Sequence, residues 1–326
     1  MVNVQPAEEA PIRSRLEFAA KAFLITSFLG VLTAGALRLR ERAIESSGHR
    51  IELGRWTVLD RPGWTTLDDV RSVRDASGLS RYHASLFDPG ALATVDAYLA
   101  RSPEVKRVAG VRRIWPNRIE AVLELRRPVV AVRVPGRTEL FVEADEEAVA
   151  LSAPKLGRPV REGTPLRIVT GSPGAAPRPG DRFGADVAAA AGLAASLDGY
   201  SDDKGRATLA WLDRIDVSNY GGRVRPGASE VLLFASPPVA PPATTLPKVV
   251  RGVVEWGRAG ERETAGGEMP FDAKASRVLQ ALRLFPRLEG IKMVRVAFND
   301  LVIVPDASPP EALKRALEID GGVQAK

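Results

Sequence analysis

The chain has 326 residues, of which 45% are hydrophobic and 26% charged, and its formal net charge is +6. This length suits two ordinary domains with connectors, and the composition excludes a disordered chain and a protein with many membrane spans. The small basic excess is spread along the chain, so we expect no nucleic-acid partner.

The chain lacks cysteine and has only two histidines, His49 and His83. Disulfide frameworks, thiol nucleophiles and cysteine-based metal centres are therefore excluded, and a histidine-rich metal site fails by count. A serine-based triad would need one of these two histidines. We accordingly predict a protein that is not an enzyme, with no catalytic, cofactor-binding or metal-binding residues.

The first long apolar segment covers residues 18–37, where Lys21 is the only charge. As a helix, these twenty residues would span about 30 Å, the thickness of the hydrocarbon layer of a bilayer. Lys21 lies near one end, where its ammonium group can reach the headgroups. We therefore predict a cytoplasmic tail at residues 1–16 and a transmembrane helix at residues 17–38, with the helix continuing to Gly48.

Two alternatives remain for this segment. One is a cleaved signal peptide, because Ala34, Gly35 and Ala36 have the small-x-small form that signal peptidase accepts; the apolar stretch is longer than usual for such a signal, and a polar stretch precedes it. The other is a buried core helix. Three Lys or Arg residues flank each side, so the positive-inside rule does not decide the orientation. We place the N-terminus in the cytoplasm because the rest of the chain has no second span and no cysteine chemistry.

Residues 50–135 are predicted to fold in the order β-α-α-β-β. Gly78 ends the first helix, and Asp88 caps the second, with Pro89 in its first turn. After Arg118 the apolar and polar side chains alternate, as in a strand with one face in solvent. The predicted elements are a strand at 56–59, helices at 66–76 and 89–101, and strands at 105–115 and 118–134, the last two joined by a Pro-Asn turn.

This order of elements, just past a single apolar segment, resembles the POTRA domain of the FtsQ/DivIB family of bacterial cell-division proteins. The likeness rests on the run VKRVAGVRRIWPNRIEAVLELRRPVVAV at residues 105–132. In that family a strand carrying Arg-x-Trp-Pro precedes a strand that ends in Glu-x-x-x-Pro. We expect the matching residues to have mainly structural roles in a turn, in packing and on a solvated sheet face. They are Arg113, Trp115, Pro116, Glu124 and Pro128.

An acidic run follows, where the family often has an Asp-x-x-Gly turn. It contains Glu143, Asp145, Glu146 and Glu147, and no glycine. A metal or acid–base site needs groups that converge from separate elements. We therefore predict an exposed turn, whose type the missing glycine leaves open.

Residues 136–305 are predicted to form a second, β-rich domain. A proline-rich loop at 236–248 favours polyproline II, and residues 306–326 form a flexible tail with one short helix at 310–319. The predicted elements are strands at 166–170, 215–219, 230–234 and 249–256, helices at 185–197 and 272–285, and a final strand at 294–304 that Asn299 and Asp300 interrupt.

The runs IDVSNYGG at 215–222 and WGR at 256–258 resemble the β domain that follows POTRA in the same family. In that family the last strand of this domain is an edge that pairs with a short strand of a coiled-coil division protein. The stretch that matches this edge is 294–298. The resemblance implies partner contacts by Val294, Val296, Phe298 and Leu301.

The expected fold class is α+β, with one transmembrane helix, a POTRA domain at 50–135 and a mixed β-rich domain with helices at 136–305. The resemblance implies a bitopic scaffold of the division machinery in the cytoplasmic (inner) membrane at the septum, with its bulk periplasmic or extracytoplasmic. The implied partners are division proteins of the FtsB/DivIC and FtsL class and the septal peptidoglycan synthase. Two alternatives stay open: a POTRA-bearing accessory of protein export or outer-membrane assembly, and a cell-wall enzyme that uses Asp and Glu.

Overall fold

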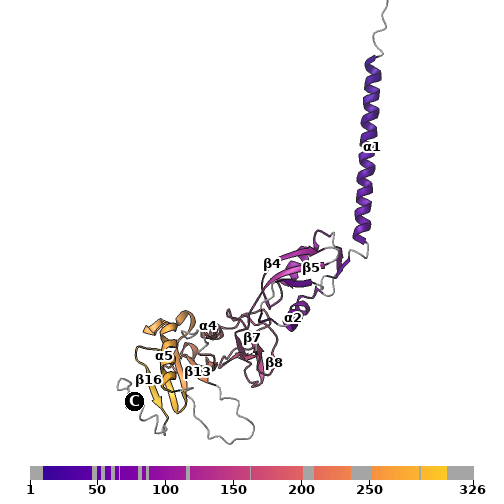
Figure 1. Cartoon of the computed structure of the whole chain (residues 1–326). Coiled ribbons are helices and arrows are strands. Elements are labelled where there is room, and N and C mark those ends of the chain that lie inside the picture. The colour runs from indigo at the N-terminus through magenta and orange to yellow at the C-terminus, as the bar shows by residue number, and fades with distance from the viewer. Residues whose placement is uncertain are drawn as a thin grey trace, which may run out of the picture. The chain divides into compact units, whose positions relative to one another are not determined.

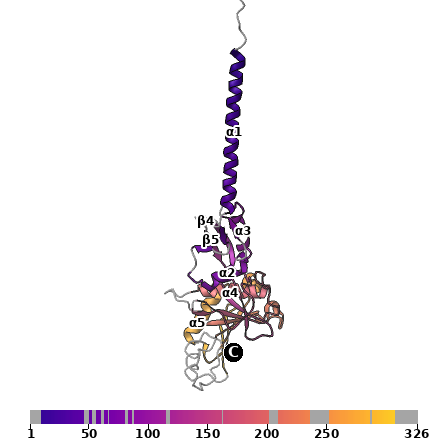
Figure 2. The same cartoon turned by 90° about the vertical axis from the view of Figure 1, so that its right-hand side faces the viewer.

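The structure, a computed structural model, is a mixed α+β fold with an N-terminal apolar helix and a large mixed sheet (Figures 1 and 2). It describes residues 10–45, 50–52, 56–59, 63–65, 67–79, 83–85, 88–114, 118–161, 163–200, 209–235, 252–285 and 288–306. Several predicted features lie outside these residues: His49, Trp115 and Pro116 with the Pro-Asn turn, the proline-rich loop at 236–248, and the helix at 310–319.

The chain divides into two compact units. The first contains Met1–Arg61, Arg74–Ala100 and Val108–Leu123, and the second contains Pro62–Val73, Arg101–Arg107 and Glu124–Lys326. The predicted domain boundary after residue 135 stays a prediction.

Helix α1 runs from Ala10 to Glu45 (Figure 1). Its stretch Leu16–Arg42 has a mean hydropathy of 1.7 and is long and apolar enough to cross a membrane. The hydroxyl groups of Thr26 and Thr33 donate to carbonyl groups four residues earlier, at 2.8 and 2.7 Å, so these polar groups are satisfied within the helix. The prediction that the helix continues beyond residue 38 is confirmed as far as Glu45.

A three-stranded sheet has the order β2-β5-β4, with β2 (Trp56–Leu59) parallel to β5 (Arg118–Leu125), and β4 covers Val105–Ile114. The alternation predicted for β5 is confirmed, because Ile119, Ala121, Leu123 and Leu125 are buried. A separate pair joins β1 (Arg50–Glu52) to β3 (His83–Ser85). Helices α2 (Leu67–Ser77) and α3 (Ala91–Leu99) follow β2, and β3 lies between them in the sequence, so the predicted order β-α-α-β-β is wrong at this point.

Two details of this region differ from the prediction. Helix α3 begins at Ala91, and Asp88 does not cap it; the Asp88 carboxylate accepts from the Gly90 N–H at 2.8 Å. The strand predicted at 118–134 is also two strands. Pro128, which has no N–H, is buried in the break, and Val129 donates to the Ala144 carbonyl at 2.9 Å. The chain after this break forms β6, which joins the large sheet of the second unit.

Within the described residues, the large sheet has nine strands in the order β16-β15-β14-β13-β12-β11-β6-β7-β8. Strand β11 is parallel to β6 and β12, β14 is parallel to β15, and the other pairs are antiparallel. The bounds are β6 Val130–Arg133, β7 Leu140–Ala144, β8 Lys155–Leu156, β11 Arg167–Thr170, β12 Leu212–Asp216, β13 Val231–Ala235, β14 Val253–Gly257, β15 Ile291–Arg295 and β16 Val302–Pro305. A short hairpin, β9 (Val160–Arg161) with β10 (Thr164–Pro165), stands apart from it.

Helices α4 (Ala185–Gly199) and α5 (Phe271–Leu284) lie beside this sheet (Figures 1 and 2). Their apolar side chains form one buried cluster with alternate residues of β12 to β16, such as Ile215, Leu233 and Val254. The intervening strand residues are half-buried on the other face, where the Arg214 guanidinium stacks over the Phe234 ring at 4.0 Å. The helix predicted at 272–285 is confirmed, with α5 beginning one residue earlier at Phe271, and Val278, Ala281 and Phe285 pack in this cluster.

The acidic run is only in part the exposed turn that was predicted. Glu143 and Asp145 are buried, because Glu143 pairs with Arg161 at 3.0 Å and Asp145 pairs with Arg126 at 2.6 Å. The Asp145 carboxylate also accepts from the N–H groups of Glu147 and Val149, at 3.0 and 2.9 Å, which closes the turn. Burial raises the pKa of Glu147, but hydrogen bonds from Arg126 and Lys106 outweigh it, so this pKa lies below its ordinary value.

The glycine that the acidic turn lacks is replaced by Ala148, which adopts a φ of 58° and is fully buried. A β-branched side chain there would meet both the steric penalty of left-handed backbone and a filled core. We expect Ala148→Val to lower the free energy of unfolding by about 2–4 kcal/mol. Ala148→Gly should stay within about 1 kcal/mol, because the relieved strain offsets the lost methyl group. Urea denaturation measures both; equal effects would contradict this explanation.

Candidate protein-interaction site at the sheet edge

The predicted partner stretch at 294–298 is not an open edge. Strand β15 lies between β14 and β16, and Val294 and Val296 are both 0% exposed. The chain turns back at Asn299 and Asp300 and adds β16 on the outer side of β15. The expectation that Val294 and Val296 lie on the edge is therefore wrong: their side chains pack in the core.

The other two predicted contact residues lie in the turn between β15 and β16. Phe298 is 58% exposed, whereas Leu301 is half-buried and packs against the core. The Arg277 guanidinium, on α5, donates to the carbonyl groups of Phe298 and Asn299 and so fixes this turn to the helix. The exposed aromatic ring thus sits on a braced turn, which lowers the entropic cost of its burial by a partner.

The outermost strand at this end of the sheet is β16. In the part of the chain that the structure describes, it has a strand neighbour on one side only. The Ile303 side chain is fully buried, which holds the strand in place, while the side chains of Val302, Val304 and Pro305 are half-buried. A strand held in this way offers its outer row of backbone groups to another chain.

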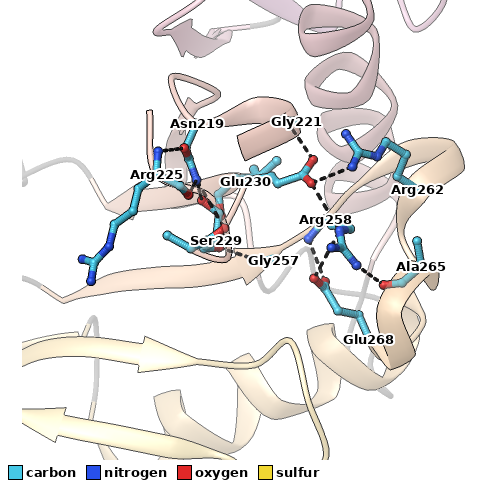
Figure 3. A network of polar contacts seen from close by, with 12 residues as sticks. Asn219, Gly221, Arg225, Ser229, Glu230, Gly257, Arg258, Arg262, Ala265 and Glu268 are labelled. Atoms are coloured by element: carbon cyan, nitrogen blue, oxygen red, sulfur yellow. Dashed lines mark hydrogen bonds and ion pairs between the residues drawn. The ribbon is translucent and has the colours of Figure 1, made fainter. Parts of the chain in front are cut away.

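Next to this turn the second unit contains a cavity of about 660 Å³. Two buried carboxylates, Glu230 and Glu268, stand on either side of Arg258 in its wall (Figure 3). Glu230 accepts from the Gly221 N–H at 3.1 Å and pairs with Arg262 at 3.0 Å; Glu268 accepts from the Arg258 N–H at 2.7 Å. Both carboxylates are held by cations and N–H groups, so we assign the network a structural role in bracing the wall.

Helix α5 contributes a buried cation to this network. Lys274 is 0% exposed, and its Nζ donates to Glu268 at 3.0 Å and to the Arg258 carbonyl at 2.9 Å. It also lies 5.7 Å from the centre of the Trp256 ring. At the neighbouring Gly257, φ is 91° and a Cβ atom would lie 2.2 Å from the Glu268 carboxylate, so only glycine fits there.

One loop of the cavity is organised by a single side chain. The Asn219 amide nitrogen contacts the carbonyl groups of Arg225, Ala228 and Ser229 at 3.1 to 3.2 Å, and its oxygen accepts from the N–H groups of Val224 and Arg225 (Figure 3). Gly221 and Gly222 form a turn nearby, with positive φ at both residues. Burial raises the pKa of Tyr220 beside it, although the Arg262 guanidinium acts in the opposite direction.

The residues that carry the POTRA resemblance have ordinary structural contacts where the structure describes them. Arg113 donates to the Asp88 carbonyl at 2.5 Å. Glu124 pairs with Arg107 at 3.2 Å, and both side chains are largely exposed, so this pair contributes little to stability. Pro128 is buried in the break after β5.

Among the described residues, no group of three or more His, Cys, Asp or Glu side chains is placed to hold a metal ion. The sheet edge carries the outer backbone groups of β16, and the exposed Phe298 ring lies in the turn before this strand. In comparisons with known proteins, no family model matches the chain and no curated protein matches it.

Proposed function

We propose that this protein is a bitopic membrane scaffold of the bacterial division machinery, which gathers other division proteins by accepting a strand on β16. The observation that supports this most is the sheet edge, where one anchored strand has an open side among the described residues. An added strand would gain main-chain hydrogen bonds from this side, and contacts with alternate side chains would select the partner.

The apolar helix supports the same proposal. Leu16–Arg42 is long and apolar enough to serve as an anchor. A tether to the membrane raises the effective concentration of partners that are held in the same plane, so a short ladder of hydrogen bonds suffices for binding. The elements from β2 to β5 include the two helices and the three-stranded sheet expected of a POTRA domain, with the short strand β3 added between the helices, and we propose that domain here.

The proposed partners follow from the sequence resemblance: proteins of the FtsB/DivIC and FtsL class, and the septal peptidoglycan synthase. The proposed place is the cytoplasmic membrane at the septum, with the N-terminus in the cytoplasm and the sheet outside it. A fluorescent fusion of the full chain should form a band at the division site; an even distribution around dividing cells would contradict the proposal.

Phe298 tests the contact surface without disturbing the core, because its ring is 58% exposed. We expect Phe298→Glu to reduce co-purification of an FtsB-class partner at least tenfold, since the change removes an aromatic anchor and leaves the fold intact. The matched control is Leu156→Glu, which places the same charge on a residue 78% exposed in β8, at the other end of the sheet. Equal recovery with both variants would argue against a contact at this turn.

The alternative functions predict different results. An accessory of protein export would co-purify with export components and leave septum formation intact when depleted. A cell-wall enzyme would turn over peptidoglycan fragments; measurable turnover by the full chain, lost on replacing Asp or Glu residues, would replace the scaffold proposal.

A further inference from the structure

The hydrogen bonds of β15 fix which backbone groups of β16 face outward. The Val296 N–H donates to the Glu255 carbonyl of β14 at 3.2 Å. Backbone groups of successive residues in a strand point to opposite sides, so Met293 and Arg295 direct theirs toward β16. These residues pair with Val304 and Val302, respectively. The N–H and C=O groups of Val302 and Val304 therefore point inward, toward β15.

A second contact gives the same alternation from the other end of the strand. The Asp306 N–H donates to the Gly290 carbonyl at 3.1 Å, so Asp306 also faces inward. The residues between, Ile303 and Pro305, then face outward. Proline has no N–H, and its ring occupies the position where a donor would meet an incoming strand. Within β16 the open side thus carries one donor, the N–H of Ile303.

We infer that Pro305 is a stop that limits the open edge to a short ladder centred on Ile303 and keeps β16 from pairing with β16 of a second copy. Two copies in antiparallel register would exchange two hydrogen bonds at Ile303. At each end of that ladder, Pro305 removes one further bond and places its ring against the opposing strand. Edge strands that carry proline resist such association. This inference rests on the proposed function only for the identity of the natural partner.

The test is self-association of the full chain in detergent micelles, measured by sedimentation equilibrium. Pro305→Ala restores one outward N–H at each end of a copy–copy ladder. At about 2- to 12-fold per backbone hydrogen bond, the two restored bonds should make association about 4- to 140-fold tighter than in the wild type. The matched control is Pro135→Ala, at an exposed turn position, which should behave as the wild type. Association of Pro305→Ala that equals the wild type would overturn the inference.

Hydrogen exchange of single amides provides a second readout on the same sample. In the wild type, the Ile303 amide should exchange at least tenfold faster than those of Val302 and Val304; in the associated Pro305→Ala variant it should slow. A protected Ile303 amide in the monomeric wild type would also overturn the inference. Neither readout uses a division partner. A failure of septal localisation would therefore contradict the proposed function but not the role that we infer for Pro305.

Discussion

Lys274→Met is expected to lower the free energy of unfolding by about 3–5 kcal/mol, because it leaves the buried Glu268 carboxylate and the Arg258 carbonyl without their shared cation. Methionine fills a similar volume, so the decrease in the free energy of unfolding comes from the lost charge and its hydrogen bonds. Urea denaturation of the full chain in micelles, followed by tryptophan fluorescence, measures it.

The double variant Lys274→Met with Glu268→Gln separates this explanation from simple loss of packing. It removes the unpaired buried charge while keeping an acceptor for the Arg258 N–H, so it should be more stable than Lys274→Met alone. The control Lys106→Met removes a cation whose side chain is 35% exposed. It should lower the free energy of unfolding by less than about 1 kcal/mol. If the double variant were no more stable than Lys274→Met, the unpaired Glu268 charge would not be the cause of the lost stability.

Arg167→Met is the second variant for which we expect a large effect. It should lower the free energy of unfolding by about 3–5 kcal/mol. Arg167 is 4% exposed and donates to the carbonyl groups of Leu212, Ala194 and Leu209 at 2.8, 3.3 and 3.2 Å, besides pairing with Asp198. Its loss would remove three hydrogen bonds that join β11 to α4 and to residues 209–212, each contributing about 1.5 kcal/mol.

Arg167→Lys should have an intermediate effect, because an ammonium group keeps the charge but cannot reach all three carbonyl groups at once. Arg182→Met, which removes an arginine with a 70% exposed side chain, should change stability by less than about 0.5 kcal/mol. If Arg167→Met were no more destabilising than Arg182→Met, the fork of hydrogen bonds would not hold α4 to the sheet.

The sequence predicts the elements whose patterns are local. The alternation after Arg118 identifies the buried face of β5, and the apolar run at 18–37 identifies the core of α1. It does not reveal pairing. The same alternation suits one strand at 294–304 or two strands that turn back at Asn299, so the position of the edge depends on the register between β15 and β16.

Buried charges are the other feature that residue types alone conceal, because isolated Lys and Arg usually lie in solvent. A usable signal exists for Lys274. It stands four residues before Val278 and seven before Ala281, on the buried stripe of α5. Arg167 alternates with Val169 on the buried face of β11, but its partners come from two other segments, α4 and residues 209–212, which the sequence does not bring together.

Amide hydrogen exchange of the full chain, with and without an FtsB-class partner, tests the central claim most directly. The account predicts that the partner slows exchange of the Ile303 amide at least tenfold and leaves Val302 and Val304, already bonded within the sheet, unchanged. A partner that binds while the Ile303 amide exchanges at its free rate would contradict it.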